Sequence, residues 1–377
     1  MTSSNSFADW NQLLAGRNLA QAPSSASSIH AGKTVLVTGA GGSIGSALVR
    51  SIAKESPELL ILLDHSEQNL YEIQSELSAL APVPRFRAIL GDMADRELVS
   101  SLFGEHRPSF VYHSAAFKHV PLMEANPFAA VRNNALATWH LARLAAEHHI
   151  PQFLLISTDK AANPRSIMGA SKRLAEVAVL RWNSPGARCS AIRLGNVFGS
   201  HGSVVRLFLR QIAEQRNLTV THKDVSRYFL TMDETVQTIF RVASLAADGG
   251  LFLPEMGDPI SIHTLATRLL EISPSNGHGA SAIKFTGLRP GDKLMEDLIS
   301  PSESLEPTSQ RGIQRIVSAL APPDALESAF GVIASHTRAR SLAALLEAIR
   351  DVVPEYEPTQ DLLQRAGAAL ANSSSHA

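Results

Sequence analysis

The feature that most constrains this chain is a glycine triplet between a β-prone run and a helical run. Residues 34–37 (TVLV) are β-rich, glycines then follow at intervals of three, and the segment from residue 46 continues as a helix. In such a unit one glycine makes the tight turn, one lets the backbone approach a pyrophosphate, and one lets helix and strand pack closely. The helix N-terminus then offers free N–H groups to the phosphates. The motif predicts a dinucleotide-binding βαβ unit. We expect these residues to contact the dinucleotide: Gly39, Gly42, Ser43, Ile44 and Gly45.

The next buried strand ends in an acidic residue that bears on the choice of cofactor. Residues 59–64 (LLILLD) end in Asp64, roughly 20 positions after Gly45. A carboxylate there would accept hydrogen bonds from the adenosine ribose hydroxyls and would repel a 2′-phosphate, so the pattern favours NAD over NADP. The alternative for Asp64 is an N-cap of the helix predicted over 67–77.

Strands and helices alternate as far as residue 180, which predicts an α/β fold with a doubly wound parallel sheet. Asp92 and Met93 follow the third strand, and we expect them at the adenine edge of the site. Ala115 follows the fourth strand, where a small residue lets the chain pass close to the pyrophosphate.

Residues 153–172 (FLLISTDKAANPRSIMGASK) combine a buried strand with polar chemistry. The apolar run predicts a strand, and the hydroxyl, carboxylate and amine of Thr158, Asp159 and Lys160 follow where it gives way to a loop. Met168 and Lys172 lie one turn apart on the next predicted helix. Titratable groups at the carboxyl end of a strand are where open α/β sheets carry out their chemistry. The alternative is a helix N-cap at Asp159 beside a solvated lysine.

The rest of the chain predicts a second, smaller unit. We expect a flexible segment over 1–32, although residues 7–14 have the apolar spacing of a short docking helix, and a nucleotide-binding core over 33–190. Residues 191–299 predict an α+β substrate lobe interleaved with the core. Residues 300–377 predict a polar linker over 300–312, then two helices and a disordered tail.

Composition narrows the class of function. The chain has 34 Lys and Arg against 35 Asp and Glu, a net charge of −1, so bulk charge indicates neither a nucleic acid nor an anionic membrane as partner. Its one cysteine, Cys189, excludes an intrachain disulfide, and its histidines do not stand at metal-ligand spacing. No apolar run reaches the length of a membrane span, and the N-terminus does not read as a secretory signal. A cytoplasmic protein is the expectation.

Taken together, these motifs resemble those of the extended short-chain dehydrogenase/reductases, and among them the CapD-type nucleotide-sugar 4,6-dehydratases of polysaccharide biosynthesis. The similarity runs from about residue 33 to about residue 299. It is carried by these blocks: TGAGGSIGS, LLDHSE, HSAAFKHVPLMEANP, STDKAANP, MGASK, GNVFGSHGSV, RYFLT and GLRPGDKL.

The resemblance implies a redox-neutral dehydration of a UDP-N-acetylhexosamine, UDP-N-acetylglucosamine first, with bound NAD taking a hydride from C4 and returning it to C6. It implies that Thr158 binds the C4 oxygen, Asp159 is the acid for the departing C6 hydroxide and Lys160 is the base at C5. A lysine base requires a lowered pKa. Lys172 would hold the nicotinamide ribose. The implied substrate-binding residues are Lys118, Asn196, Ser200 and Arg289.

Two departures from the resemblance matter. The wider superfamily has a YxxxK motif whose tyrosine removes the C4 hydroxyl proton, and Met168 stands at that position here. A thioether is only a weak acceptor and cannot act as a base, so Asp159, Lys160 or a water must take the proton. Some membrane-anchored members of the dehydratase type resemble this chain in having methionine there. The second departure is the absence of such a membrane part, which suggests the soluble portion of a longer type. A homo-oligomer is also implied.

Two other functions stay open. The first is an epimerase on the same scaffold, which needs no acid for C6 and normally keeps the tyrosine. The second is a non-catalytic NAD-binding protein, suggested by the missing tyrosine. For Arg289, the alternative is a surface charge on a Pro-Gly turn.

Overall fold

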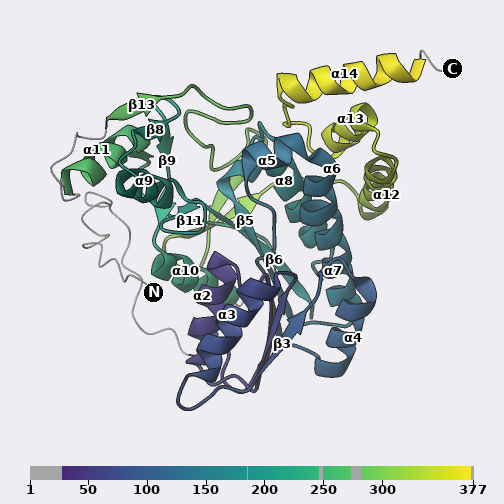
Figure 1. The fold of residues 1–377 in the computed structure, drawn as a ribbon. Coiled ribbons are helices and arrows are strands. Elements are labelled where there is room, and N and C mark those ends of the chain that lie inside the picture. The colour runs from purple at the N-terminus through teal and green to yellow at the C-terminus, as the bar shows by residue number, and fades with distance from the viewer. Residues whose placement is uncertain (1–27, 185, 246–248, 273–281, 375–377) are drawn as a thin grey trace.

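The computed structural model describes residues 28–184, 186–245, 249–272 and 282–374. The helix predicted over 7–14 lies outside them. Through the centre of the described part runs a nine-stranded sheet of order β14-β15-β11-β6-β5-β4-β1-β2-β3 (Figure 1). Its strands are β1 (Thr34–Thr38), β2 (Leu59–Asp64), β3 (Phe86–Leu90), β4 (Phe110–His113), β5 (Gln152–Thr158), β6 (Arg188–Leu194), β11 (Leu251–Pro254), β14 (Ser304–Pro307) and β15 (Ile313–Val317).

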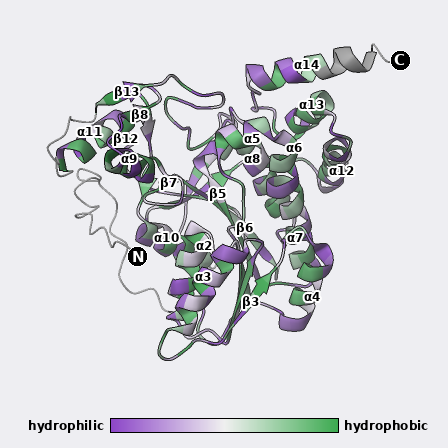
Figure 2. Ribbon diagram, viewed as in Figure 1, coloured by the Kyte–Doolittle hydropathy of each residue, from purple (hydrophilic) through white to green (hydrophobic). Residues whose placement is uncertain are grey.

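The sheet is parallel from β3 to β11, and β15 and β14 add an antiparallel edge. Its central strands are almost wholly apolar, as buried parallel strands must be when helices cover both faces (Figure 2). The prediction of a doubly wound parallel sheet is confirmed. The carboxyl ends of β1, β4, β5 and β6 therefore meet at one edge, next to the place where the strand order reverses.

Helices lie on both faces of the sheet (Figure 1). On one face α10 packs against α2, with α3 beside it, and on the other α7 packs between α4 and α8. Side chains cap several of them: Ser66 accepts from Asn69 N–H at the start of α3, and Ser166 accepts from Gly169 N–H at the start of α8. The bounds are α2 (Ser43–Ala53), α3 (Glu67–Ser78), α4 (Arg96–His106), α5 (Val120–Ala125), α6 (Pro127–Ala130), a π-helix (Val131–Leu136), α7 (Ala137–Glu147), α8 (Ile167–Arg181) and α10 (Met232–Ala243).

The C-terminal helices cover the outer face of α7 and α8. Phe330 of α12 stacks on Trp139 of α7, with ring centroids 4.1 Å apart, and Leu345 and Ile349 of α13 are buried in the same cluster. This cluster also contains Met168, so the C-terminal segment packs onto α8, the helix that carries Met168 and Lys172. The bounds are α12 (Pro323–Ala339), α13 (Leu342–Val352) and α14 (Gln360–Ser374).

The smaller lobe has its own apolar core, which includes Phe208, Phe229 and Leu265. Short strand pairs and two helices surround that core, as the α+β prediction requires, and β11 returns from the lobe to the main sheet. The exact domain boundaries stay a prediction. The lobe consists of β7 (Asn196–Val197), α9 (Val204–Ala213), β8 (Leu218–Val220), β9 (Ser226–Arg227), β10 (Phe229–Leu230), β12 (Ile260–Ser261), α11 (Ile262–Ile272) and β13 (Ile283–Phe285).

Three segments differ from the sequence prediction. Residues 28–32 are not flexible, because buried His30 bonds Tyr112 Oη at 2.6 Å and Glu55 at 2.9 Å. Part of the predicted linker over 300–312 forms β14, whose side chains are all exposed, so no apolar alternation marks it. Part of the predicted disordered tail forms α14, which Leu362 and Ala366 anchor in the C-terminal cluster.

Within the ranges given above, no helix combines the length and the apolar character that crossing a bilayer would need.

Candidate active site

The glycine loop packs closely on itself and leaves the start of α2 without a side-chain cap. Gly39 has φ 65°, and a Cβ at Gly45 would lie 1.9 Å from the Gly39 carbonyl oxygen, so neither position accepts another residue without a shift of the loop. The N-cap of α2 is Gly42, which has no side-chain cap, so the first N–H groups of the helix stay available to an anion. A Cβ at Gly39 would also lie 2.8 Å from the Ala115 backbone, which places Ala115 directly against the loop.

Asp64 supports this loop. Its Oδ2 accepts the Gly41 N–H at 2.9 Å and its Oδ1 accepts the Ser66 N–H at 2.9 Å. The N-cap of α3 is Ser66, so the alternative assignment of Asp64 as that cap is wrong. Each carboxylate oxygen has a further lone pair, with which it can accept a ribose hydroxyl.

The two residues expected at the adenine edge, Asp92 and Met93, follow β3. Asp92 is exposed and accepts from Ala94 N–H in its own turn, and Met93 is buried in the sheet core. Neither is among the described residues that line the cavity between the edge of the sheet and the lobe.

A cavity of about 980 Å³ lies between the edge of the sheet and the lobe. It runs from the glycine loop past the ends of β4 and β5 to the loops of the lobe. Most of the predicted site residues line it: Gly42, Ser43, Ile44, Gly45, Lys118, Thr158, Lys160, Met168, Lys172, Asn196, Ser200 and Arg289. The sheet edge thus brings together residues from Gly42 to Arg289.

Thr158, Asp159 and Lys160 form one hydrogen-bonded unit at the end of β5. A 3₁₀ turn (Asp159–Ala161) follows the strand directly. Thr158 Oγ1 and Lys160 Nζ both donate to Asp159 Oδ1 at 2.9 Å. The Asp159 side chain is fully buried, and its Oδ2 has no hydrogen-bond partner among the described residues. A buried carboxylate oxygen without a partner is costly, and such atoms call for an explanation such as a catalytic role.

The charge on Lys160 differs from the expectation. Burial alone would lower its pKa, but Asp159 and Glu296, at 2.9 and 3.3 Å from Nζ, outweigh burial and raise the pKa above its usual value. Arg227 acts in the lowering direction but does not reverse the result. The prediction that Lys160 has a lowered pKa, as a lysine base needs at rest, is therefore wrong. Lys160 rests as an ammonium group.

Met168 and Lys172 lie on α8, one turn apart as predicted. Met168 both lines the cavity and packs in the C-terminal cluster, so its packing and its place in the site are compatible. Lys172 Nζ donates to the Ile156 carbonyl at 2.8 Å, and burial lowers the pKa of Lys172 to about 8. The two lysines of the cavity therefore differ in charge behaviour.

The lobe supplies polar groups to the cavity. Asn196 Oδ1 accepts from Lys160 Nζ at 3.2 Å. Burial, together with Arg206 of α9, lowers the pKa of Lys118, which follows β4 in the core. Arg289 is 57% exposed and pairs with Asp292 at 2.9 Å. Arg289 lines the cavity wall, and its role in binding the diphosphate stays a prediction.

One contact ties the lobe to the glycine loop, and the sequence did not indicate it. The ring Nδ1 of His201 lies 2.7 Å from Ser43 Oγ, which also accepts the His201 backbone N–H at 2.9 Å. Of the histidines that the sequence predicted to have no ligand role, His119 lines the cavity. His113 lies between Thr38 and Thr138 in the core. Nowhere in the described residues do three metal-ligating side chains gather.

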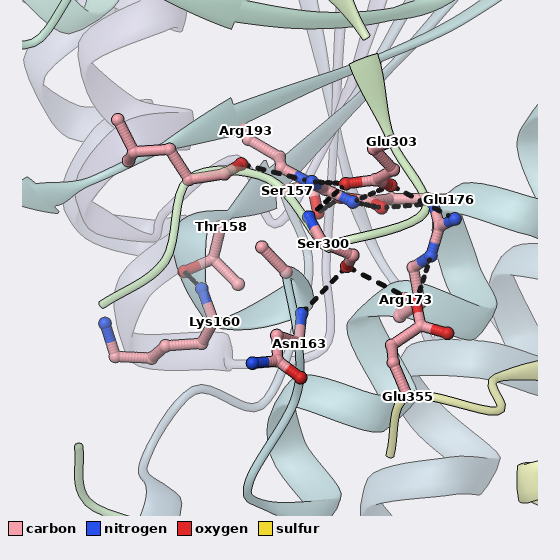
Figure 3. A network of polar contacts seen from close by, with 12 residues as sticks. Ser157, Thr158, Lys160, Asn163, Arg173, Glu176, Arg193, Ser300, Glu303 and Glu355 are labelled. Atoms are coloured by element: carbon pink, nitrogen blue, oxygen red, sulfur yellow. Dashed lines mark hydrogen bonds and ion pairs between the residues drawn. The ribbon is translucent and has the colours of Figure 1, made fainter. Parts of the chain in front are cut away.

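A second cluster of buried polar residues lies next to the end of β5 (Figure 3). Arg193, fully buried on β6, makes paired contacts with Glu176 at 2.8 and 2.9 Å and with Glu303 at 2.7 and 2.9 Å. Arg173 bonds the same two carboxylates. Ser157, next to Thr158, donates to Glu176 at 2.6 Å. Charged residues inside apolar segments, Arg193 in a strand and Glu176 in a helix, were the signal that sequence reasoning missed.

The fold and this site define the class of protein: an α/β protein whose cavity lies at the switch point of a doubly wound sheet. The family model described as polysaccharide biosynthesis protein matches residues 35–318. The capsular polysaccharide biosynthesis protein CapD of Staphylococcus aureus is 43% identical over 274 residues, which are 72% of this chain and 46% of CapD. The chain belongs to this polysaccharide biosynthesis family. It spans about half the length of CapD.

Solved structures agree with the fold. Pen from Bacillus thuringiensis superposes with a TM-score of 0.69 at 28% identity, covering 77% of this chain and 90% of Pen. DesIV of Streptomyces venezuelae is a dTDP-glucose 4,6-dehydratase solved with NAD. Two of its structures superpose with a TM-score of 0.61 at 22% identity, and the match covers 70% of this chain and 87–88% of DesIV. The extended short-chain dehydrogenase/reductase fold predicted from the motifs is confirmed.

Proposed function

We propose that this protein is an NAD-dependent 4,6-dehydratase of a UDP-N-acetylhexosamine, with UDP-N-acetylglucosamine as the first candidate substrate. The observation that carries the proposal is the Asp159–Lys160 pair. Lys160 lines the cavity, and Asp159 is buried directly behind Thr158 and Lys160 with one carboxylate oxygen that has no partner among the described residues. Met168, a thioether, also lines the cavity in place of a tyrosine. The substrate class comes from the family resemblance. The broader part of the proposal, that the protein modifies a nucleotide sugar in polysaccharide biosynthesis, is supported by its family membership.

The residues present fit NAD. The glycines let the loop pack closely on itself and on Ala115, and the N-terminus of α2 has no side-chain cap. Asp64 has lone pairs left for a ribose, and its hydrogen bonds are to backbone N–H groups rather than to a basic side chain that could bind a 2′-phosphate. When bound, NAD would supply a hydride acceptor at C4 and a hydride donor at C6. Lys172, on the cavity wall, would hold the nicotinamide ribose.

The chain's own groups would handle the protons. Thr158 would hold the C4 oxygen by its hydroxyl. Asp159 is ionised at rest beside the Lys160 ammonium group, so it would first take up the proton released from the C4 hydroxyl, directly or from the group that accepts it first, and would then give this proton to the C6 hydroxyl as it leaves as water. Lys160 would accept the proton from C5, which the C4 ketone makes acidic, once it has lost the proton it carries at rest. Met168 cannot take the C4 proton. Lys172, with its pKa near 8, joins Asp159, Lys160 and a water as a candidate for that step.

Incubation of the full chain with UDP-N-acetylglucosamine, followed by mass spectrometry and NMR of the product, tests the proposal. A product lighter by one water, with a C6 methyl group, is the expected result. A product of unchanged mass would instead support the epimerase, the second candidate, for which the shared scaffold is the only argument. Absence of turnover in the wild type and in Asp159→Asn alike would favour a non-catalytic NAD-binding protein.

The remaining expectations stay predictions from the sequence. A homo-oligomer and a cytoplasmic location rest on the resemblance and on composition alone.

A further inference from the structure

Glu296 is a buried carboxylate that sequence reasoning left without a role. It lies beyond the GLRPGDK turn and is 4% exposed. Its Oε1 lies 3.3 Å from Lys160 Nζ and 3.3 Å from Arg227 Nε. Since an ionised carboxylate is buried only when paired, Glu296 depends on these two cations.

Lys160 is thereby placed between two carboxylates from different parts of the chain. Asp159 reaches Nζ from the end of β5, and Glu296 reaches it from the segment that follows the lobe. Asn196 Oδ1 also accepts a hydrogen bond from Lys160 Nζ at 3.2 Å. The charges therefore alternate along a row of Asp159, Lys160, Glu296 and Arg227, and Lys160 and Arg227 line the cavity.

Arg227 is held independently of Glu296. It donates to the backbone carbonyls of Ser226, Leu294 and Lys293. The row is therefore anchored at its far end, and removal of the Glu296 charge would leave Arg227 with these acceptors.

We propose that Glu296 is a positioning residue of the active site, which fixes the place and the charge of the Lys160 amine and receives its proton during the reaction. This deepens the proposed function and rests on it for the reaction step.

The proton balance explains why a second carboxylate is needed. For Lys160 to act as the base, the C5–H bond breaks and an N–H bond forms on Nζ, while an N–H bond of the resting ammonium breaks and an O–H bond forms on a carboxylate. Asp159 by then carries the proton released from the C4 hydroxyl, which it gives to the departing C6 oxygen, so it cannot also accept the proton of Lys160. Glu296 is the other carboxylate recorded within 3.3 Å of Nζ, and it returns the proton through Lys160 when C5 is reprotonated.

The first test measures the charge of Lys160 without any substrate. Trace acetylation with acetic anhydride, which reacts only with neutral amines, is carried out across pH on the full chain. The peptide containing Lys160 is then quantified by mass spectrometry after complete labelling with a heavy isotope under denaturing conditions. In the wild type we expect a midpoint above that of an ordinary lysine.

Glu296→Gln should lower the Lys160 midpoint by about one to three pH units, the usual effect of losing an opposite charge at this distance. Arg227→Met should raise the midpoint, because Arg227 lowers the Lys160 pKa. The matched control is Asp297→Asn, which removes the neighbouring carboxylate that pairs with Lys293 instead, and it should leave the midpoint unchanged. An unchanged midpoint in Glu296→Gln overturns the proposal.

The second test measures the reaction. In Glu296→Gln the plateau value of kcat should fall while KM changes little, and the ascending limb of the pH profile should move to lower pH with the labelling midpoint. A normal plateau with a shifted limb would overturn the proton-accepting role. If the wild type makes no dehydrated product, the proposed function fails, whereas the labelling result still decides whether Glu296 sets the charge of Lys160.

Discussion

The two buried ionic clusters of this protein lie close together but are built differently. In the cluster around Arg193, Glu176 and Glu303 each pair with both Arg193 and Arg173, and none of these four residues lines the cavity. In the cluster around Lys160, the amine lies at the cavity wall and Asp159 Oδ2 is left without a partner among the described residues. Figure 3 shows the Lys160 side chain pointing away from the Arg193 cluster.

The difference indicates what each cluster does. In a cluster with all its hydrogen bonds made, the removal of one member leaves another charge buried and unpaired, so it contributes mainly to stability. A cluster that keeps a buried carboxylate oxygen unpaired, with its amine at a cavity wall, has a group that can accept a proton. Burial also shifts the pKa of Glu176 upward, yet Arg193 and Arg173 outweigh it and the pKa falls, so this carboxylate stays ionised.

The largest expected effect comes from the Lys160 cluster. Asp159→Asn and Lys160→Ala should each reduce turnover of the UDP-sugar by about 10²–10⁴-fold, the usual contribution of a general acid or base. Thermal unfolding should change little for Asp159→Asn, because the amide fills the same space. Steady-state assays with a coupled mass measurement check the loss. Turnover within a few-fold of the wild type in both variants would contradict the assignment.

Arg193→Met should destabilise the protein by about 3–5 kcal/mol, because Glu176 and Glu303 would remain buried without their main cation. Urea unfolding monitored by tryptophan fluorescence measures this free energy. The control is Arg216→Ala, which breaks the exposed Arg216–Glu214 pair and should cost no more than about 1 kcal/mol. Equal effects in the two variants would mean that the Arg193 cluster does not stabilise the fold.

Lys172 should make stability depend on pH in the alkaline range. Its pKa is about 8 in the folded protein against 10.5 as the ordinary value, so the unfolded chain binds the proton more tightly. Stability should therefore rise between about pH 8 and pH 10.5, by up to about 3 kcal/mol relative to Lys172→Met. Unfolding free energies of both proteins across this range check the sign. A flat difference would refute the lowered pKa.

The smallest expected effect tests whether a change in the Arg193 cluster alters turnover at the Lys160 cluster. Ser157→Ala removes the hydroxyl that donates to Glu176 at 2.6 Å, next to Thr158 of the active site. A hydrogen bond to a charged group contributes about 1.5–3 kcal/mol, and Arg193 and Arg173 still hold Glu176, so we expect a loss near the lower end. If turnover falls more than the loss of stability explains, the Arg193 cluster also positions the catalytic strand.

Much of the fold could be predicted because its signals are local. The glycine spacing around Gly39–Gly45, the apolar run ending at Asp64 and the strand before Thr158 each predict their own element, and the parallel order follows from their alternation. The strand β14 could not be predicted, since it is held by backbone pairing with β15 and its side chains are exposed. His30 could not be predicted either, because its burial depends on Tyr112 and Glu55, distant in the chain.

The same distinction applies to the active site. The residue types at 158–160, the methionine at 168 and the lysine at 172 were apparent from the chain, because they are neighbours in one strand and one helix. Their ionisation was not. Glu296 lies 136 positions from Lys160 (296 − 160) in the chain but 3.3 Å away in space, and its charge helps decide which form the amine takes.

The sequence by itself determined the α/β class, the nucleotide loop and the identity of the chemical groups at the end of β5. Only the tertiary structure decided which of those groups are charged, which acceptor remains unpaired, and that the C-terminal helices pack on the helix carrying Met168 and Lys172. The physical reason is that a local pattern depends on bonds between near neighbours. Electrostatic free energy instead depends on distance and burial, which exist only after distant segments have packed together.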